Sequence, residues 1–184
     1  MSVKLRRQLY IPPFQIDTNL LNAKQKLPEV NQLEKWANDE VILINMSSTA
    51  RNESLAGNNQ LRVQKANTHI FTVSESIDED DPLYRRIESY IFPDGAKDEN
   101  QKNDIRIVCE AQKYQAILVT NDGGSKKQPG GILGNRDKFR DRVMVMNPME
   151  ALQHIRMHIQ ERDRIARQVS IAEGCPPPFW VGMD

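Results

Sequence analysis

The sequence has little cysteine, few aromatic residues and no long apolar run. Its 184 residues include only two cysteines, Cys109 and Cys175, and 6% aromatic residues. Two distant cysteines do not make the dense disulfide framework of a small secreted domain. No apolar stretch approaches the roughly 20 residues of a membrane span, and the N-terminal segment lacks the apolar core of a signal peptide. We therefore expect a cytoplasmic protein without a membrane anchor.

An excess of charge of either sign is also absent. The chain has 25 Lys and Arg against 25 Asp and Glu, so its formal net charge is zero. A neutral chain binds nucleic acid only through a local basic patch, so the overall charge decides nothing about such a partner. A hydrophobic fraction of 39% fits a soluble globular protein, and the length favours one decorated domain.

Short apolar segments alternate with helical patterns along the chain. Four segments read as strands: 14–16, 41–44, 116–119 and 143–146. Continuous apolar runs of this kind are typical of parallel strands covered on both faces. Helical patterns precede the second and third strands, at Val30–Ala37 and Ile105–Cys109. The sequence thus predicts a three-layer α/β/α domain with a mostly parallel central sheet.

A last helix is predicted after the fourth strand. Asn147 and Pro148 are a typical N-cap and first-turn pair. The apolar face behind them, which is expected to run past Arg162, consists of Met149, Leu152, Ile155 and Ile159.

The expected domain covers residues 1–160, followed by a C-terminal extension at 161–184. Residues 74–103 are polar and acidic and are interpreted as an insertion or flexible excursion with one short helical stretch, 83–91. The proline-rich tail after Cys175 cannot be helical through its prolines. It is expected to pack along the surface or against a partner.

Two carboxylates directly follow predicted strands. Asp17 comes after the first strand and Asp122 after the third. In open parallel sheets, ligands bind beyond the carboxyl ends of the strands. Glu53 lies just beyond the second strand, in an expected early helical turn. Asp104 is expected to open the helix before the third strand, on its sheet-facing side. Four acids are therefore predicted to converge on one edge of the sheet.

Clustered carboxylates raise one another's pKa unless a cation neutralises them. Oxygen ligands without His or Cys favour Mg²⁺ or Mn²⁺, and one or two such ions suit phosphodiester hydrolysis.

Each acid also has a simpler interpretation. Asp17 is suited to capping a helix from Thr18, and Asp122 with Gly123 forms a turn signal. Glu53 is compatible with a solvated helix residue, and Asp104 with a favourable charge near a helix N-terminus. If all four simpler interpretations hold, it is only by chance that four acids are predicted at the same edge of the sheet.

The order and spacing of these segments resemble the PIN-domain superfamily of metal-dependent nucleases, including its toxin-type ribonucleases. The resemblance rests on Ile16–Leu21, Ser47–Glu53, Asn103-Asp104 and Ala116–Asp122, and it spans roughly residues 10 to 157. Members that act as toxins are usually shorter than this chain.

The resemblance implies a ribonuclease whose four acids coordinate Mg²⁺ or Mn²⁺ to cleave RNA. Thr120 and Asn19 are implied as supporting residues. It also makes a homodimer and a protein inhibitor or antitoxin expected partners beside RNA. In the glycine-rich loop after Asp122, Lys126 and Lys127 are candidate contacts to RNA phosphates.

Other signals are weaker. The glycine-rich loop matches no nucleotide-binding fingerprint. His154 and His158 have the i, i+4 spacing of metal ligands but lack the Glu and third ligand of a zinc site. A haloacid dehalogenase-type phosphohydrolase requires an Asp where Asn19 stands. An inactive PIN-like module that binds RNA or assembles with partners is the main alternative to the enzyme.

Overall fold

The chain folds around a four-stranded parallel sheet. The structure is a computed structural model that describes residues 5–21, 27–56, 60, 77–124 and 130–184. Its strands are β1 (Phe14–Ile16), β2 (Ile44–Asn45), β3 (Ile117–Val119) and β4 (Val145–Met146). They follow the order β2-β1-β3-β4, and every neighbouring pair is parallel. All four carboxyl ends therefore meet at one edge of the sheet.

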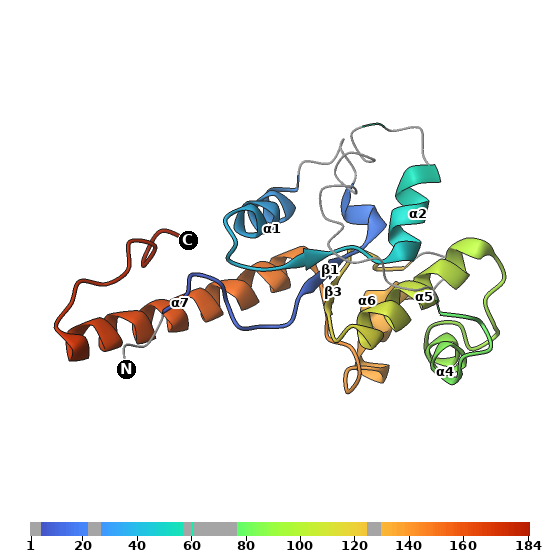
Figure 1. Ribbon diagram of the computed structural model, residues 1–184. Helices are drawn as coiled ribbons and strands as arrows, with labels where there is room; N and C mark the ends of the chain where they lie inside the picture. The colour runs from blue at the N-terminus through green and yellow to red at the C-terminus, as the bar shows by residue number, and fades with distance from the viewer. Residues whose placement is uncertain (1–4, 22–26, 57–59, 61–76, 125–129) are drawn as a thin grey trace.

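Helices surround this sheet (Figure 1). They are η1 (Thr18–Leu21), α1 (Pro28–Asn38), α2 (Ser48–Ala56), α4 (Pro82–Ile91), α5 (Glu99–Lys113), α6 (Gly131–Asn135), η2 (Arg136–Lys138) and α7 (Pro148–Glu173). None of the helices in the described part of the chain has both the length and the apolar character needed to cross a bilayer.

Each face of the sheet has its own hydrophobic core. In β1, Phe14 and Ile16 join the core shared with α1 and α7. Gln15 alternates to the opposite face, where its Nε2 donates to the carbonyl of Ile107 in α5 at 2.9 Å. Leu118 of β3 lies in this second core, with residues of α4, α5 and α6. The predicted three-layer α/β/α class with a parallel sheet is confirmed.

Three strands begin later than the sequence predicts: β2 at Ile44, β3 at Ile117 and β4 at Val145. The amide of Val41 donates to the carbonyl of Trp36 at 2.8 Å, so this residue still belongs to the turn after α1. The amide of Val143 likewise donates to Phe139 at 3.1 Å. Apolar character alone does not separate a strand residue from a buried turn residue, which explains the error.

Residues 77–103 are not a flexible excursion. The predicted helical stretch is present as α4, which buries Tyr84, Ile87 and Ile91 in the core against α5. Helix α5 already begins at Glu99, after Asp98 caps it by accepting a hydrogen bond from Gln101. The polar composition reflects the solvent faces of two amphipathic helices. Residues 74–76 lie outside the described part of the chain.

Helix α7 begins as predicted and continues past residue 160. Asn147 and Glu150 form a capping box, with Pro148 in the first turn. Met149 was expected on the buried face but is 47% exposed, because Ala151 and Leu152 take the buried positions in this turn. The helix ends at Gly174, whose φ of 64° is left-handed.

The C-terminal tail packs against its own chain. In Figure 1 it folds back along α7 toward the N-terminal segment. Trp180 is buried and stacks on the guanidinium of Arg162, 4.7 Å from the ring centre. Asp184 accepts hydrogen bonds from Arg162 and from Arg7. The tail thus contacts both α7, through Arg162, and the N-terminal segment, through Arg7.

A buried carboxylate joins α2 to α5. Glu110 of α5 is fully buried and accepts a hydrogen bond from Thr49 Oγ1 at 2.6 Å and one from Ser48 Oγ at 3.2 Å. Both hydroxyls belong to the first turn of α2, where the helix dipole favours a negative charge. This contact sets the spacing of the two helices.

Replacing Glu110 with Ala is expected to lower the free energy of unfolding by about 2–4 kcal/mol, because the buried Thr49 hydroxyl and the part-buried Ser48 hydroxyl each lose a hydrogen bond and a cavity is left. Urea denaturation measures this change. Glu161→Ala, which removes an exposed ion pair with Arg164, is the control and should cost far less, because an exposed ion pair contributes little to stability. Equal losses in the two variants would contradict the role of Glu110.

Candidate functional site

Asp17 is buried at the carboxyl end of β1, between the ends of two strands. Its side chain is 5% exposed, and its amide donates to the carbonyl of Val119 in β3 at 3.0 Å. The Thr120 hydroxyl donates to Asp17 Oδ2 at 2.6 Å, and Asn19 Nδ2 donates to the same oxygen at 2.8 Å. Both residues that the sequence suggested as supports thus contact Asp17 directly.

The Thr120 hydroxyl connects three parts of the site. While it donates to Asp17, its oxygen accepts from Asn19 Nδ2 at 3.1 Å and from the amide of Asp122 at 2.9 Å. One fully buried hydroxyl therefore fixes Asp17 and the backbone of Asp122 relative to each other.

The pKa of Asp17 is raised to about 6, chiefly because burial removes water from the charged carboxylate. The hydrogen bond from Thr120 opposes this shift. The negative charges of Glu53 and Asp122 add to it. Two hydrogen bonds connect the three acid-bearing segments: Thr18, next to Asp17, donates to Glu53, and Thr120 accepts from the amide of Asp122.

Glu53 lies near the middle of α2, with both carboxylate oxygens bonded. Thr18 Oγ1 donates to Oε2 at 2.6 Å. On the other side, Asn103 Nδ2 of α5 donates to Oε1 at 2.8 Å. Glu53 thus spans the gap between the loop after β1 and helix α5.

Both carboxylate oxygens of Asp122 accept hydrogen bonds from backbone amides. Its Oδ1 accepts from the amide of Gly124 at 3.2 Å, which makes the expected turn. Its Oδ2 accepts from the amide of Ile132 at 2.7 Å. The close approach to α6 requires a glycine at 131, where a Cβ would lie 2.5 Å from Asp122 Oδ2 and where φ is +54°.

Asp104 does not open its helix, because α5 starts at Glu99. It is half-buried in the second turn of α5 and is engaged in an interaction of its own. Its neighbour Asn103 is the residue that reaches Glu53. The segment carrying Asp104 therefore adjoins the site.

The donor set fits a divalent cation in its chemistry, since carboxylate and hydroxyl oxygens are the ligands of Mg²⁺ and Mn²⁺. Within the described residues, however, no three His, Cys, Asp or Glu side chains form a ready-made metal cluster. The oxygens of Glu53 and Asp122 accept hydrogen bonds from protein donors instead. Cation binding would require these side chains to share or exchange their present partners.

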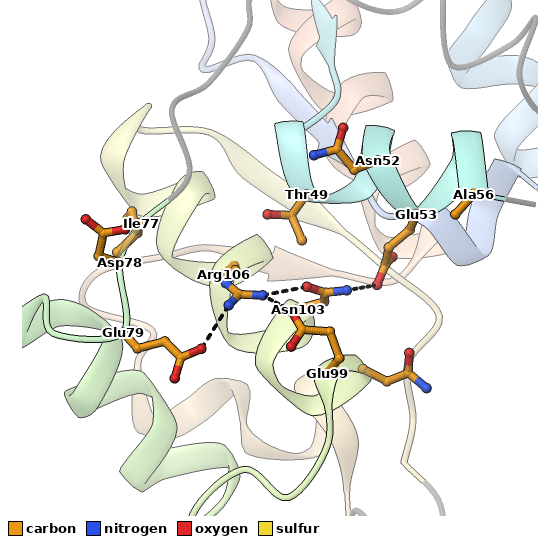
Figure 2. A pocket seen from close by; sticks show the side chains of 11 residues that line it. Thr49, Asn52, Glu53, Ala56, Ile77, Asp78, Glu79, Glu99, Asn103 and Arg106 are labelled. Carbon is orange, nitrogen blue, oxygen red and sulfur yellow. Dashed lines mark hydrogen bonds and ion pairs between the residues drawn. The ribbon is translucent and has the colours of Figure 1, made fainter.

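A groove of about 860 Å³ opens beside Glu53, between α2 and α5 (Figure 2). Arg106 and Asn103 of α5 lie at its centre, and Glu79 and Glu99 lie beside them. Sequence reasoning assigned no role to Asn103, Arg106 or Gly131, although Asn103 belongs to the Asn103-Asp104 segment that carries the family resemblance. The glycine pair at 130–131 before a helix was the one available signal for the last of these.

The remaining candidates lie elsewhere. His154 and His158 meet edge-to-face at 4.6 Å between ring centres, and the His154 ring lies 6.4 Å from that of Phe14 in the opposite core. Burial lowers the pKa of His154, as expected for a packed neutral histidine. Lys126 and Lys127 lie outside the described residues.

No protein-family model matches the sequence, and no curated protein matches it. A similar fold occurs in VapBC2 from Rickettsia felis bound to a promoter DNA fragment, with 17% identity, a TM-score of 0.47, and coverage of 73% of this chain and 97% of that chain.

FitAcB from Neisseria gonorrhoeae is 18% identical, with a TM-score of 0.43 and coverage of 74% and 98%. FitAB bound to an IR36 DNA fragment is 19% identical, with a TM-score of 0.42 and coverage of 73% and 94%. The likeness concerns the fold alone.

Asp17→Asn is expected to stabilise the cation-free protein at pH 7.5 but not at pH 3.5. A carboxyl with a raised pKa contributes its full stability below the unfolded value near 4 and loses it as the pH rises through about 6. The difference in unfolding free energy between variant and wild type should grow by roughly 3 kcal/mol over this interval, since two pKa units correspond to about 2.7 kcal/mol. Urea unfolding in EDTA measures it, and a pH-independent difference would contradict the assignment.

Gly131→Ala is expected to destabilise the protein by about 1–3 kcal/mol, because the new Cβ meets the Asp122 carboxylate and the backbone is left-handed. Gly134→Ala is the matched control in the same helix, as its Cβ meets no atom within 4 Å. Thermal and urea unfolding compare the two. Equal stability of both variants would show that Asp122 does not depend on Gly131.

Proposed function

We propose that this protein is a divalent-metal-dependent endoribonuclease that hydrolyses RNA phosphodiester bonds. The observation that carries the proposal is the buried Asp17 carboxylate at the carboxyl end of β1, with the Thr120 hydroxyl joining it to the backbone of Asp122 and the adjacent Thr18 joining its segment to Glu53. A cation removes the energetic cost of such clustered charge.

Asp17, Glu53, Asp104 and Asp122 would hold Mg²⁺ or Mn²⁺. When bound, the ion supplies Lewis-acid chemistry and activation of water for attack on a phosphodiester. The protein's own contribution is orientation. Thr120 and Asn19 fix one oxygen of Asp17, and Thr18 fixes one oxygen of Glu53.

Substrate contacts and partners extend this proposal. Lys126 and Lys127, which follow Asp122 in the sequence, would contact RNA phosphates. A homodimer, a protein inhibitor or antitoxin, and a cytoplasmic location are carried over from the family resemblance.

A second function, that of an inactive RNA-binding or assembly module, is favoured by one observation. The carboxylate oxygens of Glu53 and Asp122 accept hydrogen bonds from protein donors. Carboxylates in a site that never binds a cation are satisfied in this way. Metal binding decides between the two functions, because the inactive module needs none.

The proposal is tested by incubating purified protein with single-stranded RNA and Mn²⁺ or Mg²⁺. Wild-type protein should cleave internally, and EDTA should abolish cleavage. Asp17→Asn and Asp122→Asn should each reduce the rate at least about a hundredfold, because the cation loses a charged ligand. Asp141→Asn, an exposed acid near η2, is the control and should retain the wild-type rate.

Cleavage that persists in both site variants would refute the proposed site. RNA binding by wild-type protein without cleavage, and with no calorimetric signal for Mn²⁺, would establish the inactive module instead.

A further inference from the structure

We infer that Asn103 and Arg106 are positioning residues that hold Glu53 in its orientation for cation binding. The inference deepens the proposed function and rests on it. Both residues project from α5 into the groove beside Glu53, as Figure 2 shows. Neither is one of the acids.

The contacts form a chain of three side chains. Arg106 Nη1 donates to Asn103 Oδ1 at 2.9 Å. Asn103 Nδ2 then donates to Glu53 Oε1 at 2.8 Å. The guanidinium therefore acts on the carboxylate through one amide.

Arg106 determines which way this amide points. A carboxamide has an acceptor end and a donor end, whereas a guanidinium only donates. Contact with Arg106 therefore requires the oxygen of Asn103 on that side, and the NH₂ group is left facing Glu53. A reversed amide would place an oxygen against the carboxylate and nitrogen against the guanidinium, and would lose both bonds.

Arg106 is itself well anchored. Its side chain is 19% exposed, and its Nη2 donates to Glu79 Oε1 at 3.0 Å. Nη1 also pairs with Glu99 one turn or more earlier in α5. These two carboxylates balance the guanidinium charge and leave it free to orient Asn103.

The other oxygen of Glu53 is held by Thr18, which belongs to η1 directly after Asp17. Glu53 is thus clamped from two sides, by the segment of Asp17 and by the segment of Asp104. Hydrogen bonds to ligand side chains from such supporting residues typically contribute ten- to a hundredfold in metal affinity. The chain from Arg106 is therefore expected to affect cation affinity first and turnover second.

The test measures Mn²⁺ binding by calorimetry without RNA, together with kcat and KM for RNA cleavage. Asn103→Leu removes the donor to Glu53 at similar volume, and Arg106→Met removes the group that orients the amide. Both should weaken Mn²⁺ binding by about tenfold. Arg106→Lys keeps a cationic donor and should recover part of the loss.

At saturating Mn²⁺, kcat should return to within about threefold of wild type, with an unchanged KM for RNA. Arg164→Met is the matched control, since Arg164 makes an exposed arginine–glutamate pair on α7; its Mn²⁺ affinity should stay within twofold. Melting temperatures identify any variant that fails to fold, and Arg106→Lys then carries the comparison with Asn103→Leu.

Unchanged Mn²⁺ affinity in Asn103→Leu and Arg106→Met would overturn the inference while the proposed function stands. A raised KM with unchanged Mn²⁺ affinity would also overturn it, because Arg106 would then contact RNA directly. Wild-type protein that binds no Mn²⁺ would instead refute the proposed function on which the inference rests.

Discussion

The geometry of the candidate site depends on one buried carboxylate, that of Asp17, where the parallel strands β1 and β3 end. Asp17 continues the pairing of β1 with β3 through its amide, so its side chain is fixed where water is excluded. Burial of a charge is costly unless hydrogen bonds or a counterion compensate. The Thr120 hydroxyl supplies part of this compensation, and its remaining bonds then place Asp122 and Asn19. The positions of Asn19, Thr120 and Asp122 therefore follow from the hydrogen bonds that the buried Asp17 carboxylate requires.

The elements that carry the other acids are fixed by separate contacts. Glu110 joins α2 to α5, so Glu53 and Asn103 face each other across a set distance. On the opposite side, Asp122 accepts the amide of Ile132 and thereby ties α6 to the end of β3. These contacts fix the helices and the strand end that carry the acids, so any change on cation binding is limited to the hydrogen bonds of the side chains themselves.

The sequence predicted the features that follow from periodicity and from strand ends. Apolar runs identified all four strands, and the position after a strand identified Asp17 and Asp122. Strand limits failed at Val41 and Val143, because buried turn residues look the same as strand residues in composition. The contribution of α4 was missed since its polar face dominates the segment. The contacts of Asn103 and Arg106 with Glu53 could not be predicted from the sequence, because α5 and α2 meet only in the folded chain.

The donors that hold Asp17 and Glu53 are neutral hydroxyls and amides. This choice orients a carboxylate and leaves its charge in place, whereas a guanidinium in direct contact would neutralise it and compete with a cation. Arg106 lies one amide away from Glu53, and its own charge is balanced by Glu79 and Glu99. Arg106 thus orients Asn103, and the neutral Asn103 amide in turn orients Glu53 without bringing a positive charge into contact with it. The neutral spacer therefore leaves the negative charge of Glu53 in place, which is what the proposed cation site requires of this carboxylate.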